Sequence, residues 1–301
     1  MSLVINHNMM ALNAARNLSN SYGALATSTR RLSSGLRVGT AADDAAGLAI
    51  RELMRADIAS LNQGMRNAND AISLIQTADG ALQVIDEKLI RMKELAEQAA
   101  TGTYTSDQRM IIDSEYQAMA SEITRIANAT DFNGIYLLNG NLSGAEHNGT
   151  GLNATGRLKV HFGAGNSSAE DYYYIQIGAA TASALGVGNQ SDNSTEALSA
   201  GFSISTQAGA QAALDALNQA IVSKDKIRAN LGALQNRLEN TITNLSIQAE
   251  NLQSAESRIS DVDVAEEMTN FVRNQILTQS AVAMLAQANQ LPQMAMQLMQ
   301  G

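Results

Sequence analysis

Apolar residues recur every seven positions along much of the chain, and this pattern predicts long helices that pack side by side. The strongest stretch covers about residues 61–99, where six consecutive heptads keep two columns without a skip. The first column is Leu61, Ala68, Ile75, Leu82, Leu89 and Ala96, and the second is Gly64, Ala71, Ala78, Ile85, Met92 and Ala99. Such columns are typical of coiled-coil packing, and the many alanines and glycines indicate a close approach of neighbouring helices.

Two further helices are predicted in the N-terminal half. The first covers about residues 4–34 and ends at Gly35, because glycine readily takes the left-handed conformation of a helix C-cap. The sequence Thr-Ala-Ala-Asp at 40–43 predicts a capping box that opens the following helix. Another helix begins near Ser106. The heptad column of the first helix is Ala11, Leu18, Leu25 and Leu32, and the apolar face of the helix near Ser106 is Ile112, Tyr116, Met119, Ile123 and Ile126.

The C-terminal half repeats the heptad pattern. Its main column is Leu231, Leu238, Leu245, Leu252 and Ile259. From about Val264 to Gln300 a last helix is rich in methionine and glutamine, and its predicted apolar side is Met268, Val272, Ile276, Ala283 and Leu285. These columns and those of the N-terminal half predict the helix seams: Leu18, Leu25, Leu32, Leu61, Leu82, Leu89, Leu231, Leu238, Leu245, Leu252, Ile259, Ile276 and Leu285.

Residues 131–204 differ in kind. The dipeptides Asn133-Gly134, Asn139-Gly140 and Asn148-Gly149 are typical of hairpin turns, and stretches 158–162 and 172–177 alternate as strands do. We therefore predict a mainly α fold with a small β-rich insert in the middle of the chain. The predicted division is a terminal helical domain of 1–42 and 262–301, an inner helical bundle of 43–130 and 205–261, and an insert of 131–204.

Composition supports long helices and excludes several classes of protein. The 301 residues include one proline and no cysteine or tryptophan, and 4% are aromatic. Proline scarcity favours uninterrupted helices. The absence of cysteine excludes disulfides, thiolate metal sites and a cysteine nucleophile.

Charge is unevenly placed. The net charge is −9, yet all 29 acidic residues lie between Asp43 and Glu267. The first 42 residues carry four arginines, and the segment after Glu267 carries only Arg273. These arginines are too scattered to predict nucleic-acid or lipid binding. Amphipathic helices with so little surface charge are unusual in a soluble monomer, so we expect both ends to pair and then to be buried in a polymer, in preference to a closed monomeric bundle.

No catalytic, cofactor or metal site is predicted. The three histidines, His7, His147 and His161, have no metal-binding spacing. Asp261, Asp263 and the following Glu266-Glu267 lack the spacing of a calcium loop and instead favour a helix N-terminus. We also expect no cleaved secretion signal and no membrane insertion.

Several strings resemble bacterial flagellins. They are Ser-Ser-Gly-Leu-Arg-Val at 33–38, Ala-Asp-Asp-Ala-Ala-Gly-Leu-Ala-Ile at 42–50, Val-Ile-Asn-His-Asn at 4–8, Thr-Asp-Phe-Asn-Gly at 130–134 and Leu-Ala-Gln-Ala-Asn-Gln at 285–290. The resemblance covers about residues 1–140 and 205–301 and indicates a compact type with little outer-domain insertion.

The resemblance implies a structural subunit that self-assembles through its terminal helices into the bacterial flagellar filament for swimming. It implies export through a type III channel, an extracellular location in the flagellum, and an export chaperone, a filament cap and junction proteins as partners. Arg30, Arg31, Asp43 and Asp44 fall at the joint between the terminal and inner helices. A capping role and a contact between subunits both remain open for them.

The resemblance also implies a contact with the vertebrate Toll-like receptor that senses flagellin. In many flagellins the segment matching 89–98 makes this contact. Here Arg91, Glu94 and Leu95 match that motif, as does Glu122 on the next helix, whereas Ile90 stands where the family has glutamine. Because Leu89 is a seam residue, helix packing is the alternative role of this stretch.

Three other functions are alternatives to a filament subunit. A hook–filament junction or other axial protein would share the terminal helices. A helical signalling protein of the chemoreceptor type would share the heptads, but the uncharged ends and the β insert argue against it. An enzyme is the weakest alternative, since no site is present.

Overall fold

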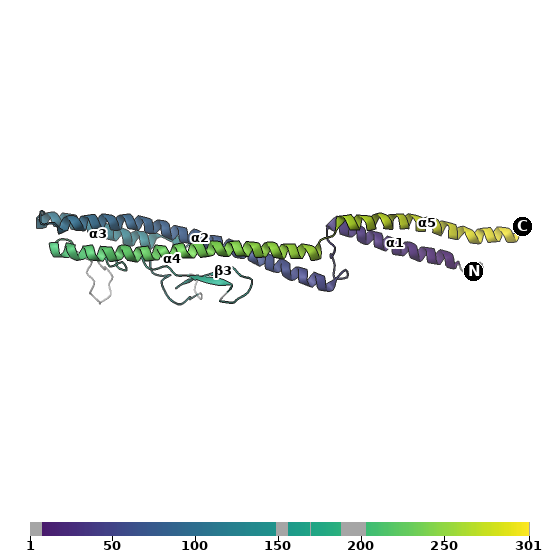
Figure 1. Cartoon of the computed structure of the whole chain (residues 1–301), viewed down its shortest axis with the longest axis horizontal. Helices are drawn as coiled ribbons and strands as arrows, with labels where there is room; N and C mark the ends of the chain where they lie inside the picture. The colour runs from purple at the N-terminus through teal and green to yellow at the C-terminus, as the bar shows by residue number, and fades with distance from the viewer. Residues whose placement is uncertain (1–7, 149–155, 169, 188–202, 301) are drawn as a thin grey trace. The chain divides into compact units, whose positions relative to one another are not determined.

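The protein is mainly helical, as the heptad pattern predicts. The computed structural model describes residues 8–148, 156–168, 170–187 and 203–300. In this part of the chain the helices are α1 (Met9–Ser34), α2 (Ala45–Ala100), α3 (Ser106–Ala129), α4 (Gln207–Ser260) and α5 (Val264–Gln300), as Figure 1 shows. The strands are β1 (Asp131–Phe132), β2 (Ile135–Tyr136), β3 (Leu158–His161) and β4 (Tyr172–Ile175). No helix of the described part is long and apolar enough to cross a membrane.

The chain divides into two compact units, which are described separately. Unit 1 contains Met1–Ile58 and Glu250–Gly301, and unit 2 contains Ala59–Ala249. Helices α2 and α4 each contribute one part to either unit. The three-part division predicted from the sequence places its boundaries elsewhere and stays a prediction.

Unit 2 contains one continuous apolar core. All twelve positions of the two α2 columns between Leu61 and Ala99 are buried. On α3, Ile112, Tyr116 and Ile123 are buried, and Met119 and Ile126 are half-buried against the same core. On α4 the column residues Leu231, Leu238 and Leu245 are also buried. The predicted columns are therefore the core-facing sides of three helices.

Glycine at position 64 lets a hairpin lie directly on α2. A Cβ atom there would collide with the backbone carbonyl oxygen of Phe162. Three residues along the helix, Asn67 Nδ2 donates a hydrogen bond of 2.8 Å to the His161 carbonyl. The second heptad column thus uses its one glycine where the backbone of the insert touches the helix.

The insert contains the two predicted strands and a smaller hairpin. Strand β3 pairs with β4 in antiparallel register, with Leu158 opposite Ile175. Strands β1 and β2 are joined by Asn133 and Gly134, whose φ angles are 52° and 79°. Two positive φ angles are typical of the tight hairpin turn that Asn-Gly predicts. The dipeptide 139–140 forms a bend without strands, and the Asn148-Gly149 prediction extends beyond the described residues.

In unit 1 the first helix ends as predicted and the second begins later than predicted. Gly35 caps α1 in the left-handed conformation, with φ of 71°, and its N–H donates to the Arg31 carbonyl. Thr40 and Asp43 do interact, but their hydrogen bonds close a turn before the helix. The cap of α2 is Asp44, whose Oδ1 accepts from the Gly47 N–H at 2.9 Å. Asp44 therefore caps α2 in place of the predicted capping box of Thr40 and Asp43. Only the Asp44 carboxylate reaches the free N–H groups at the start of the helix.

Helices α1 and α5 pack antiparallel to each other (Figure 1). Asn8 near the start of α1 donates through Nδ2 to the Ala288 carbonyl near the end of α5. At the other end Arg31 lies close to Glu267. The face of α1 that is least exposed follows the predicted column, with Leu18, Leu25 and Leu32 half-buried.

Candidate assembly surface

Helix α5 has one face turned to α1 and an apolar remainder that stays exposed. The residues with little exposure are Glu267, Thr278 and Ala288, and Leu285 is half-buried. Of the predicted side, Met268, Val272, Ala283 and Ile276 are exposed, Ile276 to 57%. The structure therefore brings Leu285 to the α1–α5 interface and leaves Ile276 on the outer surface.

Large apolar side chains cover the outside of the α1–α5 pair. Met284 is 65% exposed, although methionine normally lies inside. Among the side chains that the structure describes, the large exposed apolar residues of these two helices are Met9, Met10, Leu12, Tyr22, Val264, Met268, Val272, Ile276, Leu277, Val282, Met284 and Met294. Single exposed apolar residues are common on any protein, but this many on two helices favour an interaction surface.

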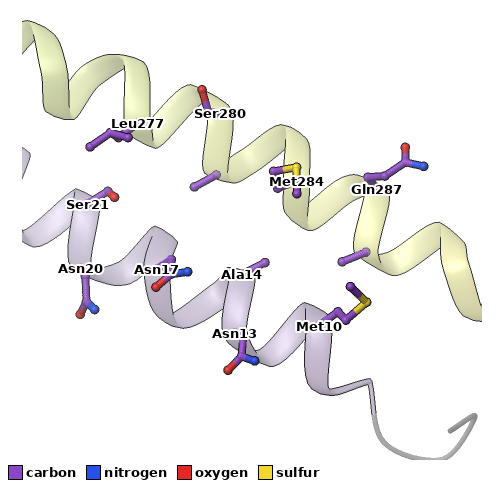
Figure 2. A pocket seen from close by; sticks show the side chains of 12 residues that line it. Met10, Asn13, Ala14, Asn17, Asn20, Ser21, Leu277, Ser280, Met284 and Gln287 are labelled. Atoms are coloured by element: carbon purple, nitrogen blue, oxygen red, sulfur yellow. The ribbon is translucent and has the colours of Figure 1, made fainter. Parts of the chain in front are cut away.

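A groove runs between the two helices. Its volume is about 650 Å³. Figure 2 shows Met10 and Ala14 of α1 directed toward α5, and Leu277 of α5 directed toward α1. Its lining also includes uncharged polar side chains such as Asn17 and Ser280. No lining residue is charged, so the groove suits an apolar or uncharged surface.

The joint residues come together in unit 1, around Asp43. Arg30 Nη2 lies 2.9 Å from Asp43 Oδ1, and Arg31 Nη2 lies 4.0 Å from the same atom. The hydrogen bonds from Thr40, followed by the charges of the two arginines, hold the pKa of Asp43 below its usual value. Asp44 does not join this cluster, because its carboxylate caps α2.

Glu267 completes the joint and was not predicted. Its Oε2 lies 3.6 Å from Arg31 Nη1, and the residue is buried. The Arg31 Nε atom is buried and has no acceptor among the described residues. The sequence placed Glu267 in an acidic cap of α5, and that cap is provided by Asp263, whose Oδ1 accepts from the N–H groups of Ala265 and Glu266.

The loop after α1 is tied to the junction of α4 and α5. Leu36 and Asp261 form an isolated antiparallel bridge, and the Arg37 N–H donates to the Ser260 carbonyl at 2.7 Å. Arg37 also donates through Nη2 to the Ile259 carbonyl at 2.6 Å. The last seam positions of α4, Leu252 and Ile259, are half-buried. Backbone bonds thus hold the two chain ends together at this point.

The segment implied to contact a receptor is split between surface and core. Arg91 pairs with Glu94 at 3.0 Å and with Glu115 on α3 at 2.8 Å, and these contacts raise the arginine pKa. Leu95, in contrast, is 2% exposed and belongs to the core. Glu122 pairs with Arg125 on the surface of α3.

Among the described residues, no group of three or more histidine, cysteine, aspartate or glutamate side chains is arranged to hold a metal ion. The candidate site is therefore a set of helix faces.

Comparison with known proteins identifies the family of these helices. The bacterial flagellin N-terminal helical region matches residues 5–143, and the bacterial flagellin C-terminal helical region matches residues 214–299.

Relatives match over nearly the whole chain. The flagellar filament 33 kDa core protein of Treponema phagedenis is 43% identical over 99% of this chain and 100% of its own length. The chain belongs to the bacterial flagellins. The flagellin of Bacillus subtilis is 42% identical over 98% of this chain and 99% of its own. Among solved structures, Bacillus cereus flagellin shares 28% identity, with a TM-score of 0.45, over 64% of this chain and 94% of its own.

This flagellin is therefore a structural, non-enzymatic subunit of the flagellar filament, and its place is the flagellum. Self-polymerisation follows from membership of the family. The function is that of a filament protein rather than a junction protein, because the full-length relatives are filament proteins and flagellins.

Proposed function

We propose that this flagellin polymerises by burying the exposed apolar faces of α1 and α5, and the groove between them, against the same helices of neighbouring copies. The observation that carries this proposal is the exposure of Met284, Ile276 and their apolar neighbours on helices that carry almost no charge. Apolar faces of this extent leave a monomer with unfavourable contacts to water, and association removes them.

The distribution of charge supports the same surface. A contact between identical helices is opposed by like charges, and the helix faces of α1 and α5 offer few of them. Apart from Glu266 and Glu267 in the first turn of α5, the acidic residues lie outside these two helices. Unit 2 then remains hydrated and keeps finished filaments apart through mutual repulsion.

Elongation of filament seeds tests this surface. Ile276→Asp or Met284→Asp places a charge in the proposed contact, and each variant should elongate wild-type seeds at least tenfold more slowly. Val222→Asp is the matched control, because Val222 is a similarly exposed apolar residue on α4 in unit 2. Equal growth of Ile276→Asp, Met284→Asp and the control, followed by electron microscopy, would contradict the proposal.

We also propose that the joint around Asp43 sets the register of one subunit on the next, through Arg30. The Arg30 side chain is half-exposed beyond its pair with Asp43. A carboxylate or carbonyl of a neighbouring copy would accept from its remaining N–H groups. Arg30→Lys keeps the charge but removes the fork, and it should slow elongation without changing the helix content of the monomer.

The other partners implied by the resemblance are an export chaperone, the filament cap and the junction proteins. We propose that they cover the same faces of α1 and α5, since these faces need a cover before polymerisation. Ile276→Asp should then weaken co-elution with a purified export chaperone, whereas Val222→Asp should leave it unchanged. Equal co-elution of both variants with the chaperone would contradict this proposal and show that the chaperone binds a different surface.

For the Toll-like receptor, we propose a contact through the exposed Arg91 and Glu94 and the half-buried Glu122. Leu95 would act indirectly, by holding α2 in the core. Arg91→Ala should lower receptor signalling by purified monomer more than Arg66→Ala, at an exposed arginine of the same helix outside the proposed contact. Equal signalling by the two variants would contradict this contact.

A further inference from the structure

Helix α4 carries a lysine inside its apolar column. Counting in sevens from Leu231 leads back to Lys224, which is 2% exposed. Its Nζ atom lies 2.6 Å from Asp86 Oδ1 on α2 and 2.8 Å from Asp225 Oδ1. About one turn along α4, Arg228 Nε lies 2.7 Å from Asp79 Oδ1, also on α2. We call Asp79, Asp86, Lys224 and Arg228 the charge clamp.

A lysine in this column lowers stability relative to an apolar residue. A buried charge loses its hydration, and apolar side chains of similar volume often replace buried ion pairs with a gain in stability. In unit 2 the other positions of this column are apolar and buried: Ala210, Leu217, Leu231, Leu238 and Leu245. Packing alone would therefore favour leucine at position 224.

Apolar packing alone also does not determine how α2 and α4 are aligned. Both columns of α2 repeat every seven residues between Leu61 and Ala99, and all their positions are buried. A shift of α4 by one heptad would again set apolar positions against apolar positions. Repetitive heptads tolerate such shifts unless a polar residue specifies the register.

The clamp discriminates against the first possible shift. If α4 moves so that Lys224 faces Asp79, the lysine keeps a carboxylate. Arg228 then moves seven positions along α2 and faces the apolar Ile72, which is packed against the core. This register leaves the arginine beside an apolar side chain and without a partner.

The opposite shift disrupts the pair between Lys224 and Asp86. Arg228 then faces Asp86 and keeps a carboxylate. Lys224, however, comes to face Lys93, and two like charges meet at a buried position. Asp225 lies on α4 itself and moves with Lys224, so only the observed alignment gives both basic residues a carboxylate on α2.

We propose that the charge clamp selects a single register of α2 against α4, at a cost in stability, and that Lys224 and Arg228 each exclude one of the two neighbouring registers. The clamp is a positioning device of unit 2 and makes no claim on how subunits meet in a filament. Because each residue blocks a different shift, loss of either one should permit a shift in one direction only.

Two spin labels can follow this shift in the full-length monomer, because the chain contains no cysteine. Gly102, just after α2, and Gly232, on α4, are suitable labelling sites, since an added Cβ would meet nothing within 4 Å at either. One heptad corresponds to a displacement of about 10 Å along the helix. The Gly102→Cys, Gly232→Cys protein should give one distance by pulsed electron paramagnetic resonance.

The two clamp variants should change this distance in opposite directions. In Lys224→Leu a second population should appear about 10 Å shorter, and the thermal unfolding midpoint should equal or exceed that of the parent. In Arg228→Leu the second population should be about 10 Å longer. Lys226→Leu, at an exposed lysine of the same helix, is the matched control and should leave a single, unchanged distance.

Each other outcome overturns the proposal. A single unchanged distance in both clamp variants would show that packing alone selects the register. A shift in the wrong direction would refute the assignment of the two residues. Failure of Lys224→Leu to fold would also refute it, because leucine at this position should support the bundle at least as well as lysine does.

Discussion

The same seven-residue pattern is buried to different extents in the two units. Along α2 in unit 2, every seam position from Leu61 to Ala99 is buried. Along α1 in unit 1, the seam residues Leu18, Leu25 and Leu32 are only half-buried. Unit 2 surrounds its seam with three helices and the insert, whereas α1 packs against a single helix, α5.

This difference teaches that a heptad pattern predicts which side of a helix is covered, but not by which molecule. A helix seam needs neighbours on both flanks before water is excluded. Unit 2 finds them within its own chain. For unit 1 the remaining neighbours are, by our proposal, other copies of the same chain.

The largest expected effect comes from shortening a seam residue in each unit. Leu82→Ala in unit 2 should lower the free energy of unfolding of the monomer by about 3 kcal/mol, because Leu82 is fully buried and a cavity remains. Leu25→Ala in unit 1 should cost about 1 kcal/mol or less in the same measurement, since less of its surface is buried. Urea unfolding followed by circular dichroism compares the two.

In filaments the effect of Leu25→Ala should be larger than in the monomer. Leu25→Ala should lower the temperature of depolymerisation more than it lowers the unfolding temperature of the monomer. Equal losses from the two variants in the monomer would show that unit 1 is already as closed as unit 2.

A smaller effect is expected at two glycines of α2. Gly64→Ala should destabilise the monomer by about 2 kcal/mol, because the new methyl group collides with the Phe162 carbonyl. Gly80→Ala should stabilise it by about 0.5–1 kcal/mol, because an added Cβ there meets nothing and alanine favours the helix. Opposite signs in thermal unfolding would confirm that the hairpin rests on Gly64, and a loss of stability from both substitutions would contradict it.

The buried phenol of Tyr116 should give unit 2 a dependence on alkaline pH. Burial, with a contribution from Asp113, raises the pKa of Tyr116 above its usual value of 10.0. The unfolded chain therefore loses this proton first, so the free energy of unfolding should fall as the pH rises above about 10.

Tyr116→Phe should remove the part of the alkaline fall in the free energy of unfolding that this phenol causes. At neutral pH it should be neutral or stabilise by about 1 kcal/mol, because Tyr116 Oη has no hydrogen-bond partner among the described residues. Urea titrations at pH 8 and pH 10.5 provide the measurement. A marked loss of stability at pH 8 would mean that the hydroxyl group is paired.

The smallest effect is expected at the joint of unit 1, where Asp43 pairs with the half-exposed Arg30. Asp43→Asn removes a carboxylate whose pKa is lowered by Thr40 and the two arginines. Its contribution is present above the usual aspartate pKa and lost as the pH falls below it. Because exposed ion pairs contribute little, the global unfolding temperature should not change at neutral pH. Faster amide exchange confined to residues 36–47 is the expected signal, and unchanged exchange there would contradict it.

Much of the fold could be predicted from the sequence where one side of a helix differs clearly from the other. The α2 columns, the Gly35 cap and the Asn133-Gly134 turn each follow from a local rule. The face of α5 could not be predicted in this way. Its apolar side chains, from Met268 to Met284, surround the helix, so periodicity does not reveal which face meets α1.

The candidate sites show the same limit. Arg30, Arg31 and Asp43 were predicted together, but Glu267 was missed because its partner lies far away in the sequence. For Lys224 the sequence does carry a signal, since this lysine falls seven residues before Leu231 in an apolar column. A charge in a heptad column predicts a partner across the interface, and only the structure identifies that partner as Asp86.

Hydrogen exchange of monomer and filament tests most directly whether other copies complete unit 1. In the monomer, amides of α1 and α5 should exchange at least about a hundredfold faster than amides of α2 between Leu61 and Ala99, because local opening costs less where fewer apolar contacts are lost. In filaments the two sets should approach equal protection. Equal protection already in the monomer, or unchanged fast exchange of α1 and α5 in filaments, would contradict assembly through the terminal helices.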